Sequence, residues 1–317
     1  MTRFFRDLAG PCLATQGSVV AIGAFDGLHR GHQALLAQLR ARADACGLAA
    51  AVVTFEPLPR AFFSNEPLPR LGSARERLAG LVAAGIDVVL QLRFDHALSG
   101  TSAEAFVEQV LRDRLAAREV WIGEGFQFGH KRGGDLGLLQ RLGESCGFRA
   151  TAMPRVLLED EHVSASRVRR LLAEGRLDDA ATQLGRPFVI EGRVGHGHRL
   201  GRTLGYPTAN IALRGRVSPL RGIFAVRVGL GEAECSWPGV ASLGVRPTVN
   251  ELPQPLLETH LFDFDGDLYG RRMAVQFVGK LRDEAKFDDL DALKAQMDRD
   301  ADAARALLGM NPRLSGA

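Results

Sequence analysis

The sequence has little of what would tie it to a membrane, a disulfide framework or a zinc site. Its four cysteines are scattered along 317 residues. None of them forms a CxxC pair, which disfavours a zinc site or a disulfide scaffold. No apolar run approaches the roughly 20 residues of a membrane span, and charges at positions 3, 6 and 7 interrupt the apolar core that a signal peptide needs. We therefore expect a soluble, cytoplasmic protein with free thiols and no membrane partner.

A strong net charge and stacking aromatics are also missing. The formal net charge is +3, and the chain has two tryptophans and two tyrosines. A protein that binds single-stranded nucleic acid needs basic surfaces interleaved with exposed aromatic rings. The composition therefore predicts no nucleic-acid partner, while local basic pockets for phosphates stay compatible with it. The oligomeric state does not follow from the sequence.

What is present is an alternation of strand and helix patterns in the first half of the chain. Each expected strand is apolar on both faces, which is typical of a parallel sheet covered by helices on both sides. We therefore predict a doubly wound α/β domain, with ligands at the carboxyl ends of its strands. The expected strands are residues 18–25, 49–55, 87–92 and 119–123, and the expected helices are residues 33–45, 75–84 and 102–115.

The texture changes after two short helical stretches, residues 167–174 and 177–184. Gly185-Arg186-Pro187 ends the second stretch, since glycine caps helices and proline cannot continue one. We place a domain boundary there, with one domain at residues 1–185 and a second at 186–317. The β-rich runs that follow predict a small antiparallel β-barrel and a closing helix, at residues 187–194, 223–228, 258–264 and 271–278, then 288–308.

The segment from Gly23 to His32 (GAFDGLHRGH) stands between the first expected strand and the first expected helix. Glycines let backbone N–H groups approach a phosphate closely, and a helix N-terminus adds positive potential. Two histidines three positions apart, His29 and His32, can both donate to phosphate oxygens there. For an isolated HxxH, two surface histidines or a fortuitous metal pair are the alternatives. The strand, glycines and helix around them favour a phosphate site.

In a second segment, residues 163–169 (VSASRVR), hydroxyl groups precede arginine. At a helix start these side chains can clamp a phosphate, because arginine offers a planar fork of donors. A serine N-cap before a basic helix is the alternative interpretation.

A block rich in glycine and arginine opens the second domain at residues 192–210 (GRVGHGHRLGRTLGYPTAN). A dinucleotide fingerprint fails here, because Leu200 breaks the GxGxxG spacing and no helix follows. A metal tract built on His196 and His198 lacks acidic or cysteine partners nearby. We instead predict a flap over phosphates, in which Thr208 and Asn210 alternate onto one face and offer hard neutral oxygens to Mg²⁺.

These motifs resemble those of the bacterial bifunctional riboflavin kinase/FAD synthetases. Residues 23–32 are similar to the GxFDGxHxGH form of the nucleotidyltransferase HxGH motif, and residues 163–169 to its SS(T/S)RIR motif. The kinase signature GxxxGRxLGxPTAN resembles residues 192–210, and further matches follow in order at residues 219–225, 244–248, 257–264 and 281–287. The resemblance runs from Val19 to about Leu307. It implies that riboflavin is phosphorylated to FMN and FMN is adenylylated to FAD, with ATP for both steps and Mg²⁺ as cofactor.

The resemblance also implies roles for individual residues. In the adenylyltransferase, His29 and His32 would bind the ATP phosphates and stabilise charge as pyrophosphate departs. Its other implied ATP-binding residues are Gly23, Phe25, Gly31, Ser164, Ser166 and Arg167, and its flavin loop would comprise Pro57, Gly125, Phe126 and Phe128. In the kinase, Glu258 would accept the proton of the ribityl 5′-hydroxyl, and Arg282 would help to close the flavin site. The kinase ATP loop would comprise Gly195, Gly197, Gly201, Arg202, Gly205 and Pro207, beside the magnesium ligands Thr208 and Asn210.

Two departures from the family pattern lie in the first domain. Glu56 and Leu58 stand where the family motif TFDPHP has aspartate and histidine, and Gly125 stands where the family often has Asp or Asn. A lost polar contact would weaken substrate binding by ~1–3 kcal/mol, so a kinase with a weakly active first domain is the alternative. The kinase residues and signature disfavour a flavin- or RNA-binding protein, and equally a nucleotidyltransferase for another phosphate. We therefore predict the bifunctional enzyme.

Overall fold

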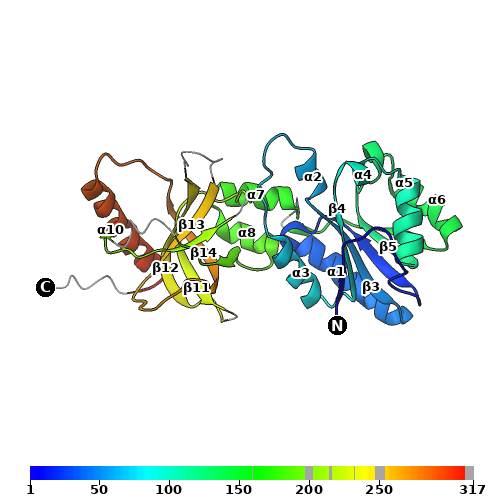
Figure 1. Ribbon diagram of the computed structural model, residues 1–317, viewed down its shortest axis with the longest axis horizontal. Helices are drawn as coiled ribbons and strands as arrows, with labels where there is room; N and C mark the ends of the chain where they lie inside the picture. The colour runs from blue at the N-terminus through cyan, green and yellow to red at the C-terminus, as the bar shows by residue number, and fades with distance from the viewer. Residues whose placement is uncertain (159, 197–202, 214–215, 232, 247–253, 311–317) are drawn as a thin grey trace. The chain divides into compact units, whose positions relative to one another are not determined.

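The computed structural model describes the chain except residues 159, 197–202, 214–215, 232, 247–253 and 311–317. It folds into two compact units (Figure 1). The first comprises Met1–Leu68 and Gly72–Ala165, and the second comprises Pro69–Leu71 and Ser166–Ala317. The compact units divide between Ala165 and Ser166, which is before Gly185, where the sequence predicts the domain boundary. That predicted boundary stays a prediction. Within the described ranges, no helix is both long and apolar enough to cross a membrane.

The first unit is built on a sheet whose neighbouring strands all run parallel, in the order β1-β4-β3-β2-β5-β6. Its strands are β1 (Arg3–Phe5), β2 (Ser18–Ile22), β3 (Ala49–Glu56), β4 (Val88–Arg93), β5 (Ala117–Gly123) and β6 (Arg149–Met153). The doubly wound α/β prediction is confirmed, and β2 to β5 match the expected strands. The sequence did not predict the edge strands, because β1 has only three residues and β6 is partly exposed.

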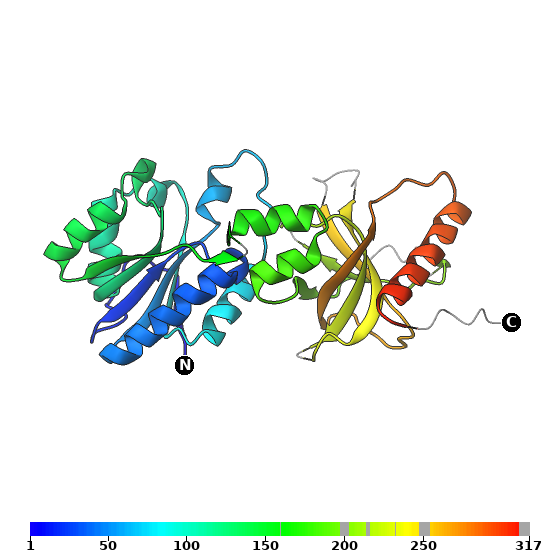
Figure 2. The same cartoon turned by 180° about the vertical axis from the view of Figure 1, so that it is seen from behind.

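Successive side chains of the inner strands point to opposite faces of the sheet and bury two apolar layers. Val19 and Ala21 pack with helices α1 and α3, whereas Val20 and Ile22 pack with α5 and η2. Figure 2 shows α1 lying across one face of the sheet. The helices are α1 (Arg30–Cys46), α2 (Pro59–Phe62), α3 (Ala74–Ala83), α4 (His96–Ser99), α5 (Ala103–Phe106), its π-helical continuation η2 (Val107–Arg114) and α6 (Leu136–Cys146), with short turns η1 (Asp26–Leu28) and η3 (His130–Arg132) and a hairpin β7 (Leu157–Leu158) and β8 (Glu161–His162).

The second unit begins with two helices, α7 (Ala165–Ala173) and α8 (Leu177–Leu184), and continues into an antiparallel sheet of order β10-β13-β12-β11-β14-β9. The strands are β9 (Val189–Arg193), β10 (Ala209–Ala212), β11 (Gly222–Leu230), β12 (Trp237–Arg246), β13 (Gln254–Leu261) and β14 (Arg272–Arg282). The Gly195 N–H donates to the Asn210 carbonyl over 2.8 Å and so joins the two ends of this sheet. The barrel prediction is confirmed.

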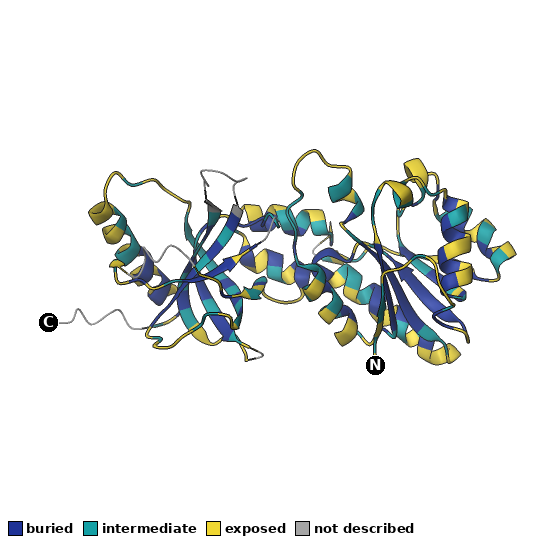
Figure 3. Ribbon diagram, in the orientation of Figure 1, coloured by how far each residue is buried: buried dark blue, intermediate teal, exposed yellow. Residues whose placement is uncertain are grey.

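Helix α10 (Leu290–Leu307) is the expected closing helix, and it packs on β11, β12 and β14. Ala301 and Ala304 bury against Tyr206 and Phe262 in a small apolar cluster. Figure 3 shows buried residues concentrated on the strands of both sheets, with exposed residues on the outer faces of the helices. Burying one large apolar side chain stabilises such a layer by about 1.5–3 kcal/mol.

Candidate functional site

The first candidate site lies at the carboxyl ends of two adjacent strands, β2 and β5. From β2 the chain continues to β3 on one side, and from β5 it continues to β6 on the other. Ligands of open parallel sheets bind where the strand order reverses in this way. The loop after β2 carries Gly23 to His29, and the loop after β5 carries Gly125 and Phe126. The fold therefore brings two of the sequence motifs to one edge of the sheet.

The backbone of the first loop takes conformations that are rare for residues with side chains. Phe25 has φ 50° and is fully buried, and Leu28 has φ 44°. Non-glycine residues with positive φ cluster at functional sites, because surrounding packing must hold them in place. Gly27, with φ 74°, supplies the third left-handed residue of the turn η1.

His29 and His32 lie together at the start of α1. His29 is the N-cap residue, and its Nδ1 accepts a hydrogen bond from the His32 backbone N–H. The two imidazole rings stack with centroids 3.7 Å apart, and the Phe25 ring lies 5.1 Å from His32. The sequence prediction that both histidines share a helix N-terminus is confirmed, while their role toward ATP stays a prediction.

Two glycines keep this cluster compact. A Cβ on Gly23 would lie 3.1 Å from the Phe25 ring, and one on Gly31 would lie 3.2 Å from the His29 ring. The Val163 carbonyl oxygen is 3.7 Å from the same Gly31 position. The chain that leads into Ser164 thus passes beside the histidine turn within the first unit.

Burial and the neighbouring His29 lower the pKa of His32 well below its ordinary value. Its Nδ1 is enclosed and has no hydrogen-bond partner in the described part of the chain. The lowered pKa favours the neutral form of the ring. A phosphate placed beside it would favour the charged form, since an opposite charge nearby raises the pKa of an imidazole.

The residues of the predicted phosphate clamp stand where the chain passes from the first compact unit to the second. Ser164 directly precedes α7, whereas Ser166 and Arg167 stand in its first turn. Ser166 is exposed, and Ser164 and Arg167 are partly buried. A role for these three residues in ATP binding stays a prediction.

The two departures from the family pattern have structural explanations. Leu58 is only 2% exposed, so it packs into the protein as an apolar residue. Glu56, whose peptide bond to Pro57 is cis, forms an ion pair of 2.7 Å with the buried Arg77. Gly125 has φ 76°, a left-handed conformation that glycine adopts at no steric cost and that only a few other residues tolerate.

Aromatic rings surround the flavin loop that the sequence predicted. Phe126 and Phe128 stack with centroids 6.0 Å apart, and Phe128 also packs on Phe106 at 5.8 Å. The sequence did not single out a second group, in which Phe62 contacts Phe63, Phe94 and His96 at the carboxyl ends of β3 and β4. Phe63 is 68% exposed, which is unusual for so large an apolar ring. In the sequence, the adjacent pair Phe62-Phe63 shortly after a predicted strand is the feature that could have indicated this aromatic group.

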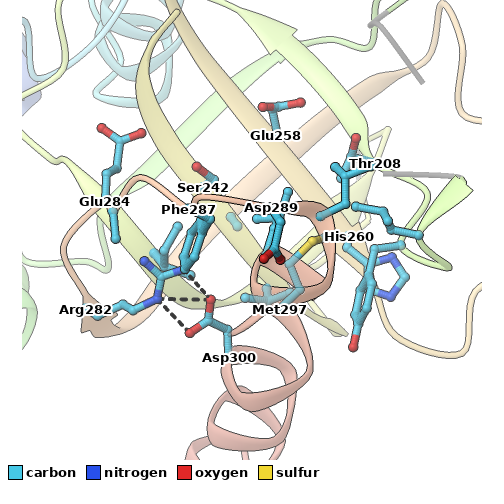
Figure 4. Close-up of a pocket in the computed structure, with 18 of the residues that line it drawn as sticks. Thr208, Ser242, Glu258, His260, Arg282, Glu284, Phe287, Asp289, Met297 and Asp300 are labelled. Atoms are coloured by element: carbon cyan, nitrogen blue, oxygen red, sulfur yellow. Dashed lines mark hydrogen bonds and ion pairs between the residues drawn. The ribbon is translucent and has the colours of Figure 1, made fainter. Parts of the chain in front are cut away.

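The second candidate site is a cavity of about 620 Å³ in the second unit. Thr208, Glu258 and Arg282 line it, together with an apolar wall of Phe287, Leu290, Leu293 and Met297 (Figure 4). The pairing of neighbouring strands fixes the position of Glu258. This residue of β13 pairs with Asn210 of β10 on one side and with Ser242 of β12 on the other. Three separate sequence segments therefore meet in one row across the barrel.

The side-chain oxygen of Asn210 is the group that bears on the predicted metal site. It is 5% exposed, its Nδ2 donates to the Thr208 carbonyl over 3.1 Å, and its Oδ1 has no hydrogen-bond partner among the described residues. Buried acceptor oxygens normally have partners. A hard cation such as Mg²⁺ prefers neutral and charged oxygens, so the residues present fit the predicted metal. In the described part of the chain, no three His, Cys, Asp or Glu side chains gather as an alternative metal site.

His260 was not singled out from the sequence, yet it fixes the turn that bears Thr208. Its Nδ1 lies 2.9 Å from the Pro207 carbonyl oxygen and, as the N–H tautomer, donates to it. The ring packs edge-on against Tyr206 with centroids 5.0 Å apart, and the Tyr206 hydroxyl donates to Asp298 of α10. The turn is thus tied both to β13 and to the closing helix.

Arg282 lines the cavity, but its guanidinium already has protein partners. Nε and Nη2 donate to the Asp300 carboxylate over 2.8 and 2.6 Å, and Nη1 donates to the Asp283 carbonyl over 2.8 Å. Figure 4 draws the Arg282–Asp300 pair on the side of the cavity away from Thr208. Arg282 therefore joins β14 to α10, and direct contact with flavin stays a prediction.

Glu284 is a second cavity residue that the sequence did not single out. Its carboxylate lies over Gly244, where a Cβ on the glycine would clash with it. Burial raises the pKa of Glu284, nearby Arg221 and Arg282 oppose this shift, and Glu258 adds to it. The glycine of the GxRPT segment leaves room for the Glu284 carboxylate in this position.

The remaining kinase residues are only partly described. Gly195 bridges to Asn210, Gly205 has φ 84°, and Pro207 accepts from His260. Gly197, Gly201 and Arg202 lie outside the described residues.

Comparison with known proteins gives one family match for each half of the chain. The FAD synthetase family matches residues 13–167, and the riboflavin kinase family matches residues 184–308. A bifunctional riboflavin kinase/FMN adenylyltransferase of Pseudomonas fluorescens is 48% identical over 92% of this chain and 93% of that protein. The enzyme of the same description from Escherichia coli K12 is 43% identical over 93% of this chain and 94% of that protein.

A crystal structure described as a macrolide-efflux protein from Streptococcus pneumoniae superposes with a TM-score of 0.76. It is 27% identical and covers 94% of this chain and 97% of that one, so the fold of both units is shared. Taken together, these matches show that the chain belongs to the bifunctional riboflavin kinase/FMN adenylyltransferase family.

Proposed function

We propose that the second unit phosphorylates riboflavin to FMN in the cavity around Glu258, and that the first unit adenylylates FMN at the turn bearing His29 and His32. As a family member, the chain is both a riboflavin kinase and an FMN adenylyltransferase. ATP is the co-substrate of both steps, and FAD and pyrophosphate are the final products. The observation that carries the assignment is that Thr208, Ser242 and Glu258 line one cavity, while strand pairing sets Asn210 beside Glu258.

In the kinase step, the Glu258 carboxylate orients the ribityl hydroxyl and accepts its proton as the oxygen bonds to the γ-phosphorus of ATP. The bond from that phosphorus to the bridging oxygen breaks, and ADP leaves. Thr208 and Asn210 would hold Mg²⁺, and the metal would supply charge neutralisation for the ATP phosphates. His260 keeps the Thr208 turn in place. The flavin ring system packs along the apolar wall that contains Phe287 and Met297.

In the adenylyl step, a phosphate oxygen of FMN attacks the α-phosphorus of ATP, and the bond from that phosphorus to the bridging oxygen breaks as pyrophosphate leaves. His29 and His32 would donate to the phosphates at the N-terminus of α1, where the helix dipole favours negative charge. Ser164, Ser166 and Arg167 would complete the phosphate contacts. Most of the catalytic effect in such a transfer comes from positioning and charge stabilisation.

We place the FMN substrate of the adenylyl step on the aromatic side of this site. Pro57 and the neighbouring Phe62 follow β3, while Gly125, Phe126 and Phe128 follow β5. Flat aromatic rings such as these stack favourably on a planar ring system. The packing of Glu56 and Leu58 supports an intact loop, and therefore supports the bifunctional enzyme over a kinase with a weak first domain.

The family matches also support the proposed domain division. The riboflavin kinase match begins at residue 184, next to the boundary that we place between residues 185 and 186. Because both steps consume ATP, we place the enzyme in the cytoplasm.

Incubation of the protein with riboflavin, ATP and Mg²⁺, followed by chromatographic separation of flavins, tests the proposal. We expect FMN to appear first and FAD to follow. FMN that accumulates without FAD would leave only the kinase. FAD formed from supplied FMN, but none from riboflavin, would leave only the adenylyltransferase.

A further inference from the structure

The side chain of Arg77 joins two loops of the first unit, which we call the substrate loops. One follows β2 and leads to His29, and the other follows β3 and begins at Pro57. It projects from α3, a helix that begins with a capping box between Ser73 and Glu76. Although charged, the Arg77 side chain is only 3% exposed. A buried charge is costly unless it is paired and hydrogen-bonded, so the partners of this guanidinium determine why it is retained.

Those partners lie on, or shortly after, three adjacent strands. Nη1 donates to the Ala24 carbonyl over 3.3 Å, in the loop that follows β2. Nη2 donates to the Phe55 carbonyl over 3.1 Å and to the Glu56 carboxylate over 2.7 Å, at the end of β3. It also lies 3.3 Å from the Gln91 Oε1 of β4.

The same helix holds the histidine turn at a second point. A Cβ on Gly80, one turn after Arg77, would lie 2.1 Å from the Leu28 side chain. Leu28 directly precedes His29 and has a positive φ. The Thr54 hydroxyl reaches the Ala24 carbonyl as well, over 3.3 Å. Helix α3 is therefore the support on which the phosphate loop rests.

We propose that Arg77 is a positioning residue for adenylyl transfer, which sets the loop of His29 and the loop of Pro57 at a fixed separation by binding both at once. Ala24 belongs to the segment that leads to His29, and Glu56 directly precedes Pro57. ATP and FMN approach these two loops, so their reacting atoms meet only if the loops keep their relative position. A misplacement of about 1 Å lowers the rate on the order of 100-fold.

Glu56 contributes to this arrangement as the counter-charge of Arg77. The carboxylate in the Arg77 pair neutralises the buried guanidinium and directs the fork toward the carbonyls. Removal of Glu56 would leave the buried Arg77 guanidinium without its counter-charge, which is costly for a buried charge. The pair should therefore behave as a unit in a double-mutant experiment.

The test compares Arg77→Met with a matched control, Arg114→Met. Arg114 is also a buried arginine of the first unit, 4% exposed, and its guanidinium binds the Asp7 and Pro11 carbonyls near the amino end of β5. Both changes remove a buried fork that holds backbone carbonyls, but only Arg77 touches the substrate loops. The kinase activity of the same chain reports the integrity of each preparation, and thermal unfolding reports the stability of the first unit.

We expect Arg77→Met to lower FAD synthesis from supplied FMN on the order of 100-fold and to raise KM for both ATP and FMN. Arg114→Met should lower the unfolding temperature but leave both KM values unchanged below that temperature. Arg77→Lys should recover part of the activity through its pair with Glu56. Glu56→Gln should raise KM for FMN more than KM for ATP, and should add little to Arg77→Met.

Unchanged KM values in Arg77→Met, or equal losses of FAD synthesis in the two methionine variants, would show that Arg77 is only structural. This inference rests on the proposed adenylyl transfer at this site. The two can fail separately: a wild-type protein that makes no FAD contradicts the proposed function, whereas a wild-type protein that makes FAD beside an unaffected Arg77→Met contradicts the inference.

Discussion

The two sites of this chain hold their reactive groups by different means. In the first unit the groups stand on loops at the ends of parallel strands, and a buried arginine and left-handed backbone positions keep those loops in place. In the second unit Asn210, Glu258 and Ser242 stand on neighbouring strands, and hydrogen-bond register places them in one row. A loop site depends on side-chain ties that can be lost singly. A strand site depends on the whole ladder and is harder to misalign.

We expect the largest effect from a substitution that removes the proton acceptor of the second-unit site and leaves the pairing of its strands intact. Glu258→Gln keeps the size of the side chain but cannot accept the ribityl proton. We expect riboflavin phosphorylation to fall on the order of 10³-fold, while FAD synthesis from supplied FMN stays intact. Separate assays of the two steps on one preparation measure this. A parallel loss of both activities would show that the substitution damages the protein rather than the reaction.

A smaller effect should follow from a change in the loop site. Gly31→Ala adds a methyl group 3.2 Å from the His29 ring, so the ring must shift by a few tenths of an ångström. We expect FAD synthesis to fall by up to about 100-fold, with kinase activity unchanged. Gly137→Ala is the control, because it adds a methyl in a helix of the same unit at ordinary contact distance, 3.5 Å from the Asp135 side chain. Equal behaviour of the two variants would contradict the importance of the stacked pair.

A substitution of His260 should make the turn that bears the predicted metal ligand Thr208 less rigid. His260→Leu removes the hydrogen bond to the Pro207 carbonyl, so the turn that bears Thr208 is held less firmly. Changes behind a metal ligand typically weaken metal affinity by about tenfold or more. Calorimetric titration of Mg²⁺ into the protein with ADP measures the affinity directly. His260→Asn retains a donor and should recover part of it; identical affinities in all three proteins would exclude the positioning role.

The smallest expected effect is a pH dependence of stability that arises from His32 in the loop site. Because burial lowers the pKa of His32 in the folded protein, the unfolded chain binds a proton at a higher pH than the folded one. The free energy of unfolding of the first unit should therefore fall as the pH drops below about 6.5, with a slope of at most about 1.4 kcal/mol per pH unit for one proton. Denaturant titrations between pH 5 and 8 measure the slope. His32→Gln should flatten it, and an unchanged slope in that variant would assign the proton elsewhere.

The comparison also separates what the sequence could predict from what it could not. Strands β2 to β5 were predictable, because each contains a short run of mostly apolar residues next to a segment of helical periodicity. The histidine turn was predictable from its motif, since the glycines and histidines have a mechanical reason for their spacing. Strand β10 was not, because Pro207 to Asn210 has the composition of a turn, and only its pairing with β13 makes it a strand.

The positioning residues were hidden for a different reason. Arg77 stands on an amphipathic helix, where an arginine normally faces solvent, and its burial depends on carbonyls from strands that are distant in sequence. His260 and Glu284 are likewise ordinary strand and loop residues until the barrel places Pro207 and Gly244 against them. Motifs mark groups that meet substrate, whereas tertiary packing creates the groups that hold them.

The bond between the Gly195 N–H and the Asn210 carbonyl has a consequence beyond the kinase cavity. Unpaired strand edges are templates on which other chains can add, and proteins avoid aggregation by covering or closing them. Here β10, at one edge of the sheet, meets the segment that follows β9, at the other edge, through the residue that would bind the metal. One short contact thus protects the second unit against edge-to-edge association and, at the same position, aligns a reactive group.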